Sequence, residues 1–103
     1  MTERQTANAA GTHLRLKLFV ADDEPNSRIA RENLADICET DLRGRCRVEV
    51  IDIFTDVEAA MRHDILLTPT LLVMDGDPPG YVIGNLSDRR KVRGALGLEK
   101  ETS

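Results

Sequence analysis

In residues 65–83 the chain reads ILLTPTLLVMDGDPPGYVI, and this stretch decides the predicted fold. Pro69 splits the first apolar run, because proline has no N–H to donate inside a central β-ladder. We therefore predict a strand from Thr70 to Met74. The loop at 75–80 is rich in Asp, Gly and Pro, which favour turns, and Tyr81-Val82-Ile83 is short and apolar. The stretch predicts two antiparallel strands joined as a hairpin.

A parallel β-α-β unit is predicted ahead of this hairpin. Residues 14–20 (LRLKLFV) alternate apolar and basic side chains, which is typical of a strand. The acidic loop at 22–25 ends the strand, and Asn26 or Ser27 can cap a helix there. Residues 47–53 are rich in β-branched side chains and predict the second strand.

Two shorter helices complete the predicted order of elements. Thr55 and Glu58 have the spacing of a capping box, in which each side chain satisfies a free backbone N–H. Ser87 can cap the last helix in the same way as other hydroxyl residues. The resulting order, β-α-β-α-β-β-α, predicts the α/β class and a thioredoxin-like arrangement.

Composition limits the domain count, the location and the partners. The 103 residues are expected to form one domain at 14–98, between a disordered polar tail (1–13) and a short tail (99–103). No window holds the ~18 apolar residues of a membrane span, and the first tail lacks the apolar core of a signal peptide. We therefore expect a cytoplasmic protein. A net charge of −4 and few aromatic residues argue against a nucleic-acid partner, and the basic run at 89–93 is expected to be a solvated helix face.

The sequence offers no catalytic or metal site. Thioredoxin enzymes place Cys-x-x-Cys where the first strand meets the first helix, but residues 21–27 read ADDEPNS. Cys38 and Cys46 are expected to be free thiols, with Cys38 packed in the core. Neither they nor His13 and His63 have a metal-ligand spacing. We expect no redox catalysis, no metal and no cofactor.

An alternative interpretation is a receiver-like, phosphorylatable signalling domain. Asp22 and Asp23 follow the first strand, where a receiver holds Mg²⁺ with an acidic pair. Asp75 ends the third predicted strand, where a receiver carries its phosphorylated aspartate. Only 28 residues follow Asp75, however, which is too few for two more β-α units. This shortage argues against the receiver, which is kept as the alternative function.

A series of short motifs follows in order along residues 14–98 without a gap. The motifs are LKLFVA (16–21), PNS (25–27), NL (33–34), VIDI (50–53), ILLTPTL (65–71), PP (78–79), IGNLSD (83–88) and ALGL (95–98). A single motif such as TPT is weak, but the ordered set resembles the KaiB family of circadian clock proteins.

This resemblance implies a non-catalytic regulator of KaiC, a hexameric ATPase that phosphorylates and dephosphorylates itself. The regulator would bind the N-terminal ATPase ring of KaiC, in competition with a thioredoxin-like domain of a sensor histidine kinase. The resemblance also implies two folds, a thioredoxin-like monomer that binds KaiC and a resting β-α-β-β-α-α-β subunit of a dimer or tetramer. Thr68, Pro69, Gly84 and Asn85 are expected to govern this choice. Whether the Thr68–Pro69 bond is cis or trans stays open.

Exposed polar side chains near the second helix are the candidates for partner contact. They are Asp56, Glu58 and Arg62, together with Arg28 on the first helix. Acidic residues near Pro78-Pro79 replace a basic pair of the cyanobacterial pattern. This departure argues against KaiA, the further clock protein that cyanobacterial KaiB traps on KaiC.

Overall fold

The computed structural model describes residues 14–75 and 79–98. Its elements are, in chain order, β1 (Leu14–Val20), α2 (Pro25–Thr40), β2 (Cys46–Asp52), α3 (Val57–Arg62), β3 (Thr70–Val73), β4 (Gly80–Ile83) and α4 (Arg89–Ala95). The predicted order β-α-β-α-β-β-α is confirmed. The two predicted tails lie outside the described residues. Within the described residues, no helix combines the length and the apolar character needed to cross a membrane.

A single four-stranded sheet, in the order β2-β1-β3-β4, forms the middle of the molecule. β1 pairs in parallel with β2, so that Leu18 lies opposite Val50. On its other side β1 pairs antiparallel with β3, with Leu18 opposite Leu71. β3 and β4 are antiparallel neighbours, which confirms the predicted hairpin. Both β2 and β4 are edge strands.

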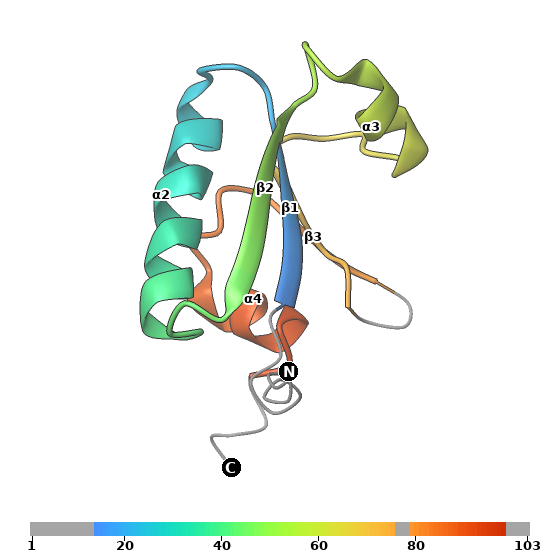
Figure 1. Cartoon of the computed structure of the whole chain (residues 1–103). Helices are drawn as coiled ribbons and strands as arrows, with labels where there is room; N and C mark the ends of the chain where they lie inside the picture. The colour runs from blue at the N-terminus through green and yellow to red at the C-terminus, as the bar shows by residue number, and fades with distance from the viewer. Residues whose placement is uncertain (1–13, 76–78, 99–103) are drawn as a thin grey trace.

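The helices divide between the two faces of this sheet (Figure 1). α2 and α4 cover one face and enclose the larger core, whose buried members include Leu18, Leu34 and Val92. The short α3 covers part of the other face, where Phe19 and Leu72 belong to a smaller buried cluster. Alternation along β1 produces both clusters, because successive side chains of a strand point to opposite faces.

The beginning of α2 differs from the predicted cap. Glu24 is the N-cap, and its side chain accepts a hydrogen bond of 3.1 Å from the backbone N–H of Ser27. Pro25 follows in the first turn, where its missing N–H has no intrahelical role. Ser27 is fully buried, and its hydroxyl accepts a hydrogen bond of 3.0 Å from the N–H of Ala21. The predicted cap at Asn26 or Ser27 is therefore wrong.

Each of the other two helices has an aspartate as its N-cap. Asp56 and Asp88 accept hydrogen bonds from the N–H three residues further on, at 3.1 and 3.3 Å. The predicted caps, Thr55 and Ser87, each stand one residue too early. The Thr55 hydroxyl instead donates to the carbonyl of Asp52 at 3.2 Å, where it closes the turn after β2.

Candidate functional site

Three of the four predicted contact residues lie together at α3. Asp56 caps this helix, Glu58 lies in its first turn and Arg62 in its last, and all three are exposed. Their charges suit the helix dipole, which favours acids at the N-terminus and bases at the C-terminus. Arg28 lies on α2, across the sheet, with its Nε atom 3.9 Å from Oδ1 of Asp23. The structure does not bring Arg28 together with the other three.

An apolar hollow of about 400 Å³ lies beside α3, between the segment that follows the helix and the strands β3 and β4. Leu66 is 91% exposed there, and the other lining residues are exposed or partly exposed except Thr70, which is buried. Contiguous apolar surface of this kind marks interaction sites on soluble proteins. We use the name α3 surface for Asp56, Glu58 and Arg62 together with the lining of this hollow: Asp64, Ile65, Leu66, Leu67, Thr70, Tyr81 and Ile83.

Sequence reasoning missed the hollow, although it had one usable signal. The apolar run at 65–67 stands ahead of Pro69 and outside any predicted strand. An apolar run that no sheet or helix buries must either pack elsewhere or stay exposed. Here Ile65 is partly buried against the small cluster under α3, whereas Leu66 and Leu67 stay exposed.

His63 connects α3 to β4. Its backbone carbonyl accepts a hydrogen bond of 3.2 Å from the hydroxyl of Tyr81. Its ring centroid lies 5.8 Å from that of Phe19, in a tilted arrangement. Burial lowers the pKa of His63, and the positive charges of Lys17 and Arg62 lower it further. The neutral imidazole is therefore favoured at the border of the α3 surface.

The residues that were expected to govern the fold meet at one corner of the sheet. The Thr68–Pro69 bond is cis, and the carbonyl of Pro69 accepts a hydrogen bond of 2.9 Å from the N–H of Gly84. Gly84 has φ = 119°, a conformation that favours glycine. The carbonyl of Asn85 accepts a hydrogen bond of 2.9 Å from Nδ2 of Asn33 on α2. The four residues are adjacent, and their control of the fold stays a prediction.

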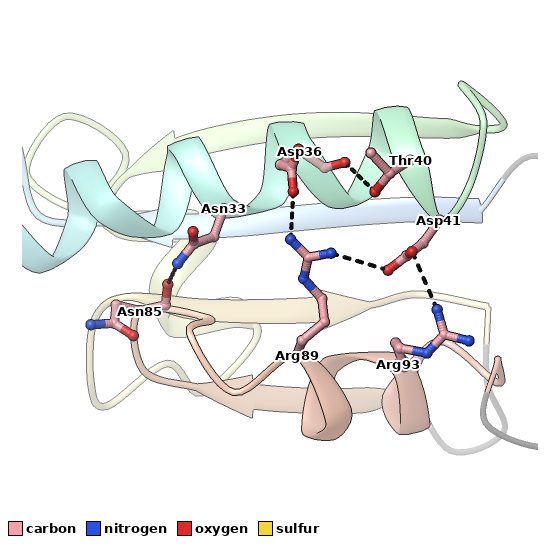
Figure 2. A network of polar contacts seen from close by, with 7 residues as sticks. All are labelled: Asn33, Asp36, Thr40, Asp41, Asn85, Arg89 and Arg93. Atoms are coloured by element: carbon pink, nitrogen blue, oxygen red, sulfur yellow. Dashed lines mark hydrogen bonds and ion pairs between the residues drawn. The ribbon is translucent and has the colours of Figure 1, made fainter.

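α4 is tied to α2 by ion pairs (Figure 2). Arg89 reaches the carboxylates of both Asp36 and Asp41, and its Nη1 lies 3.6 Å from Oδ2 of Asp41. Nη1 of Arg93 lies 3.2 Å from Oδ1 of the same aspartate, whose side chain is only 16% exposed. The expectation of a solvated basic face is wrong for both arginines, whereas Arg90 and Lys91 between them are exposed.

The two cysteines also come together. Both are free and half-buried, and both line a hollow of about 310 Å³ between α2 and β2. Burial, together with the hydrogen bond and charge of the neighbouring Cys46, raises the pKa of the Cys38 thiol to about 12. Cys38 packs against the larger core, as predicted.

The receiver interpretation is wrong, because the three aspartates it requires lie at opposite ends of β1. Asp22 and Asp23 follow the C-terminal end of this strand. Asp75 lies at the other end, where its carboxylate accepts a hydrogen bond of 2.6 Å from the N–H of Arg15. The strand between them spans roughly 20 Å at ~3.3 Å per residue. A receiver needs a third strand parallel to the first, whereas β3 runs antiparallel to β1.

Comparison with known proteins identifies the family. A family model described as the KaiB domain matches residues 17–98. The circadian clock oscillator protein KaiB of a Picosynechococcus strain is 43% identical over 84 residues, which cover 82% of this chain and 79% of that protein. Its counterpart in Prochlorococcus marinus NATL2A is 41% identical over 92 residues, covering 89% of this chain and 83% of that protein.

Solved structures agree on the fold. The Drosophila melanogaster thioredoxin Deadhead superposes with a TM-score of 0.67 at 16% identity, covering 90% of this chain and 87% of that one. The N-terminal domain of Synechococcus elongatus SasA gives 0.64 at 21% identity, covering 82% and 84% of the two chains. The predicted α/β, thioredoxin-like fold is therefore confirmed. The family model and the sequence relatives, which each cover most of the chain, show that this protein belongs to the KaiB family.

Proposed function

We propose that this chain is a clock or timer regulator that acts by binding rather than by catalysis. Its partner would be the N-terminal ATPase ring of a KaiC-like protein, and binding would modulate the phosphorylation cycle of that protein in the cytoplasm. Family membership supports the regulatory role, since the sequence relatives are clock oscillator proteins. The α3 surface supports binding as the mode of action.

The observation that carries the proposal is the exposed apolar centre of the α3 surface. Leu66 and Leu67 stand out from the chain between the charged side chains of α3 and the edge strand β4. An apolar centre with a polar rim is the usual anatomy of a protein–protein interface. Asp56, Glu58 and Arg62 would supply that rim.

A change of fold is part of the proposal. The resting form would be a dimer or tetramer of the β-α-β-β-α-α-β fold, and the partner would draw molecules from it by population shift. Two features are consistent with a rebuilt second half. β3 and β4 have only four residues each, and the residues expected to govern the fold share one corner of the sheet. A sensor-kinase domain of the same fold would compete for the ring.

Size-exclusion chromatography of the chain with the KaiC-like ATPase of the same organism tests the proposal. The proteins are mixed with ATP or ADP, and their elution is followed over hours. A complex that forms slowly would support a rare binding-competent fold, and one that forms at once would mean that the thioredoxin-like fold is already populated. No complex with either nucleotide would refute the proposed partner.

A matched pair of variants tests the surface itself. Leu66→Ser changes the centre of the α3 surface, whereas Ile29→Ser changes an exposed apolar residue on α2, across the sheet. We expect Leu66→Ser to weaken the complex at least about tenfold, because interface energy concentrates in a few central residues. Ile29→Ser should bind like the wild type. Equal effects of the two variants would show that the α3 surface is not the contact.

A further inference from the structure

The last turns of α2 and the start of β2 place two cysteines beside one hollow. Cys38 lies near the end of the helix, and Cys46 is the first residue of the strand. Both residues are half-buried, and both are free cysteines. Both line the hollow between α2 and β2, and both pack against the larger core. The pair lies on the face of the sheet opposite α3.

The short connection between the two cysteines is held by backbone hydrogen bonds. The carbonyl of Cys38 accepts one of 2.8 Å from the N–H of Gly44, and the carbonyl of Arg45 accepts one of 3.1 Å from the N–H of Leu14. Leu42 is buried in the core between these two points. The backbones of both cysteines are therefore held in place beside the same hollow. This is the arrangement that favours an intramolecular bond over a bond between chains.

Positive charge borders this pair. Arg31 lines the same hollow, and Arg45 precedes Cys46 in the sequence, whereas Arg47 lies on the opposite face of the sheet. Cationic surroundings attract negatively charged reactants. They distinguish this hollow from a plain core gap and indicate an anionic reaction partner.

We propose that Cys38 and Cys46 form a redox modification site, at which a small anionic disulfide oxidises the pair to an intramolecular disulfide. In the first step the Cys46 thiolate attacks one sulfur of the small disulfide, which gives a mixed disulfide and releases one thiol. In the second step the Cys38 thiolate attacks the Cys46 sulfur and releases the second thiol. Two electrons pass from the cysteines to the reagent, and the two protons go to the released thiolates.

The order of the two steps follows from the surroundings of each thiol. The pKa of the Cys38 thiol is raised to about 12, so its thiolate is scarce near neutral pH. Cys46 therefore reacts first with the reagent, and Cys38 acts as the resolving thiol inside the mixed disulfide. The product joins the end of α2 to the edge strand β2. This inference does not depend on the proposed function, because the pair lies away from the α3 surface.

Glutathione disulfide is a suitable probe, and intact-protein mass spectrometry is the readout. The reduced full chain and its Cys38→Ser and Cys46→Ser variants are incubated with the probe, and circular dichroism first confirms that each variant is folded. The wild type should lose two hydrogens, carry no glutathione and stay free of disulfide-linked dimers. Cys38→Ser should stop at the mixed disulfide, and it should form this adduct at least about tenfold faster than Cys46→Ser.

Other products would overturn the inference. A wild type that keeps glutathione would show that Cys38 cannot reach the Cys46 sulfur. Disulfide-linked dimers would show that the two thiols face other chains. A wild type that reacts only after unfolding would show that the hollow does not admit the reagent. Peptide mapping of the oxidised wild type provides a check that needs no variant, because it must recover residues 38 and 46 in one linked peptide pair.

Discussion

Replacing Asp41 by asparagine is expected to lower the free energy of unfolding by about 2 kcal/mol. Asp41 is the C-cap of α2, and its carboxylate is the point where both arginines of α4 meet α2. Asparagine keeps the shape of the side chain and leaves the capping backbone N–H bonded to Ile37. The substitution therefore removes charge and little else.

Two charged contacts set this magnitude. Coulomb's law at an effective dielectric constant of about 20 gives an attraction of about 5 kcal/mol for charges 3.2 Å apart, the distance between Arg93 and Asp41. Desolvation of the aspartate and the partial exposure of both arginines offset most of this attraction. Asp36 is a matched control, because its pair with Arg89 is about half exposed. Such pairs contribute roughly 0–1 kcal/mol.

Urea unfolding followed by circular dichroism measures both variants. With an m-value of about 1.3 kcal/mol per molar urea, the midpoint of Asp41→Asn should fall by about 1.5 M. Asp36→Asn should change it by less than about half that amount. In about 1 M NaCl the Asp36 effect should vanish, because exposed charges are screened, whereas most of the Asp41 effect should remain. Equal midpoints for the two variants would refute the assignment of a buried ionic contact to Asp41.

Three further predictions concern single positions. Gly84→Ala should lower the free energy of unfolding by about 2 kcal/mol, because φ is 119° there. Gly44→Ala, at φ 79°, should lower it by about 1 kcal/mol in the same urea titration. Ser27→Ala should cost about 1–2 kcal/mol by leaving the N–H of Ala21 unpaired, and faster amide exchange at Ala21 would verify the cause. The contribution of His63 to stability should be fully present above the ordinary pKa of histidine, 6.5, and should be lost as the pH falls below it. Folding lowers the pKa of His63, so the unfolded chain binds the proton more readily. His63→Gln should reduce that loss in thermal melts at pH 7 and pH 5.

The order of the elements was predictable because their patterns are local. Alternation along residues 14–20 and the turn residues of 75–80 can be recognised without any knowledge of the rest of the chain. The caps were harder to predict. Ser27 has the usual chemistry of a cap, but tertiary contacts bury it and direct its hydroxyl to Ala21, so that Glu24 caps α2 instead. Where a side chain has two possible hydrogen-bond partners, the tertiary fold and not the local sequence decides which one it takes.

Contacts between distant segments account for the remaining differences between the sequence predictions and the structure. The basic run at 89–93 is separated from Asp36 by 53 residues, so no local pattern could show that it docks on α2. The direction of β3 is a similar case. Asp75 resembled a receiver aspartate only on the assumption that β3 runs parallel to β1, and strand direction is set by pairing across the sheet. The placement of Cys38 and Cys46 beside one hollow likewise depends on how α2 packs beside β2.

The location of the α3 surface follows from the unequal lengths of the helices. α2 has 16 residues and is therefore about 24 Å long, whereas α3 has six residues and is about 9 Å long. The outer strands of a four-stranded sheet lie roughly 14 Å apart. One face is thus covered by α2 and α4, while α3 can cover only part of the other. The apolar side chains of β4 and of residues 65–67 fall in the uncovered part. A chain of this design leaves one face of its sheet incompletely covered, and this uncovered part is the surface on which the proposed partner would dock.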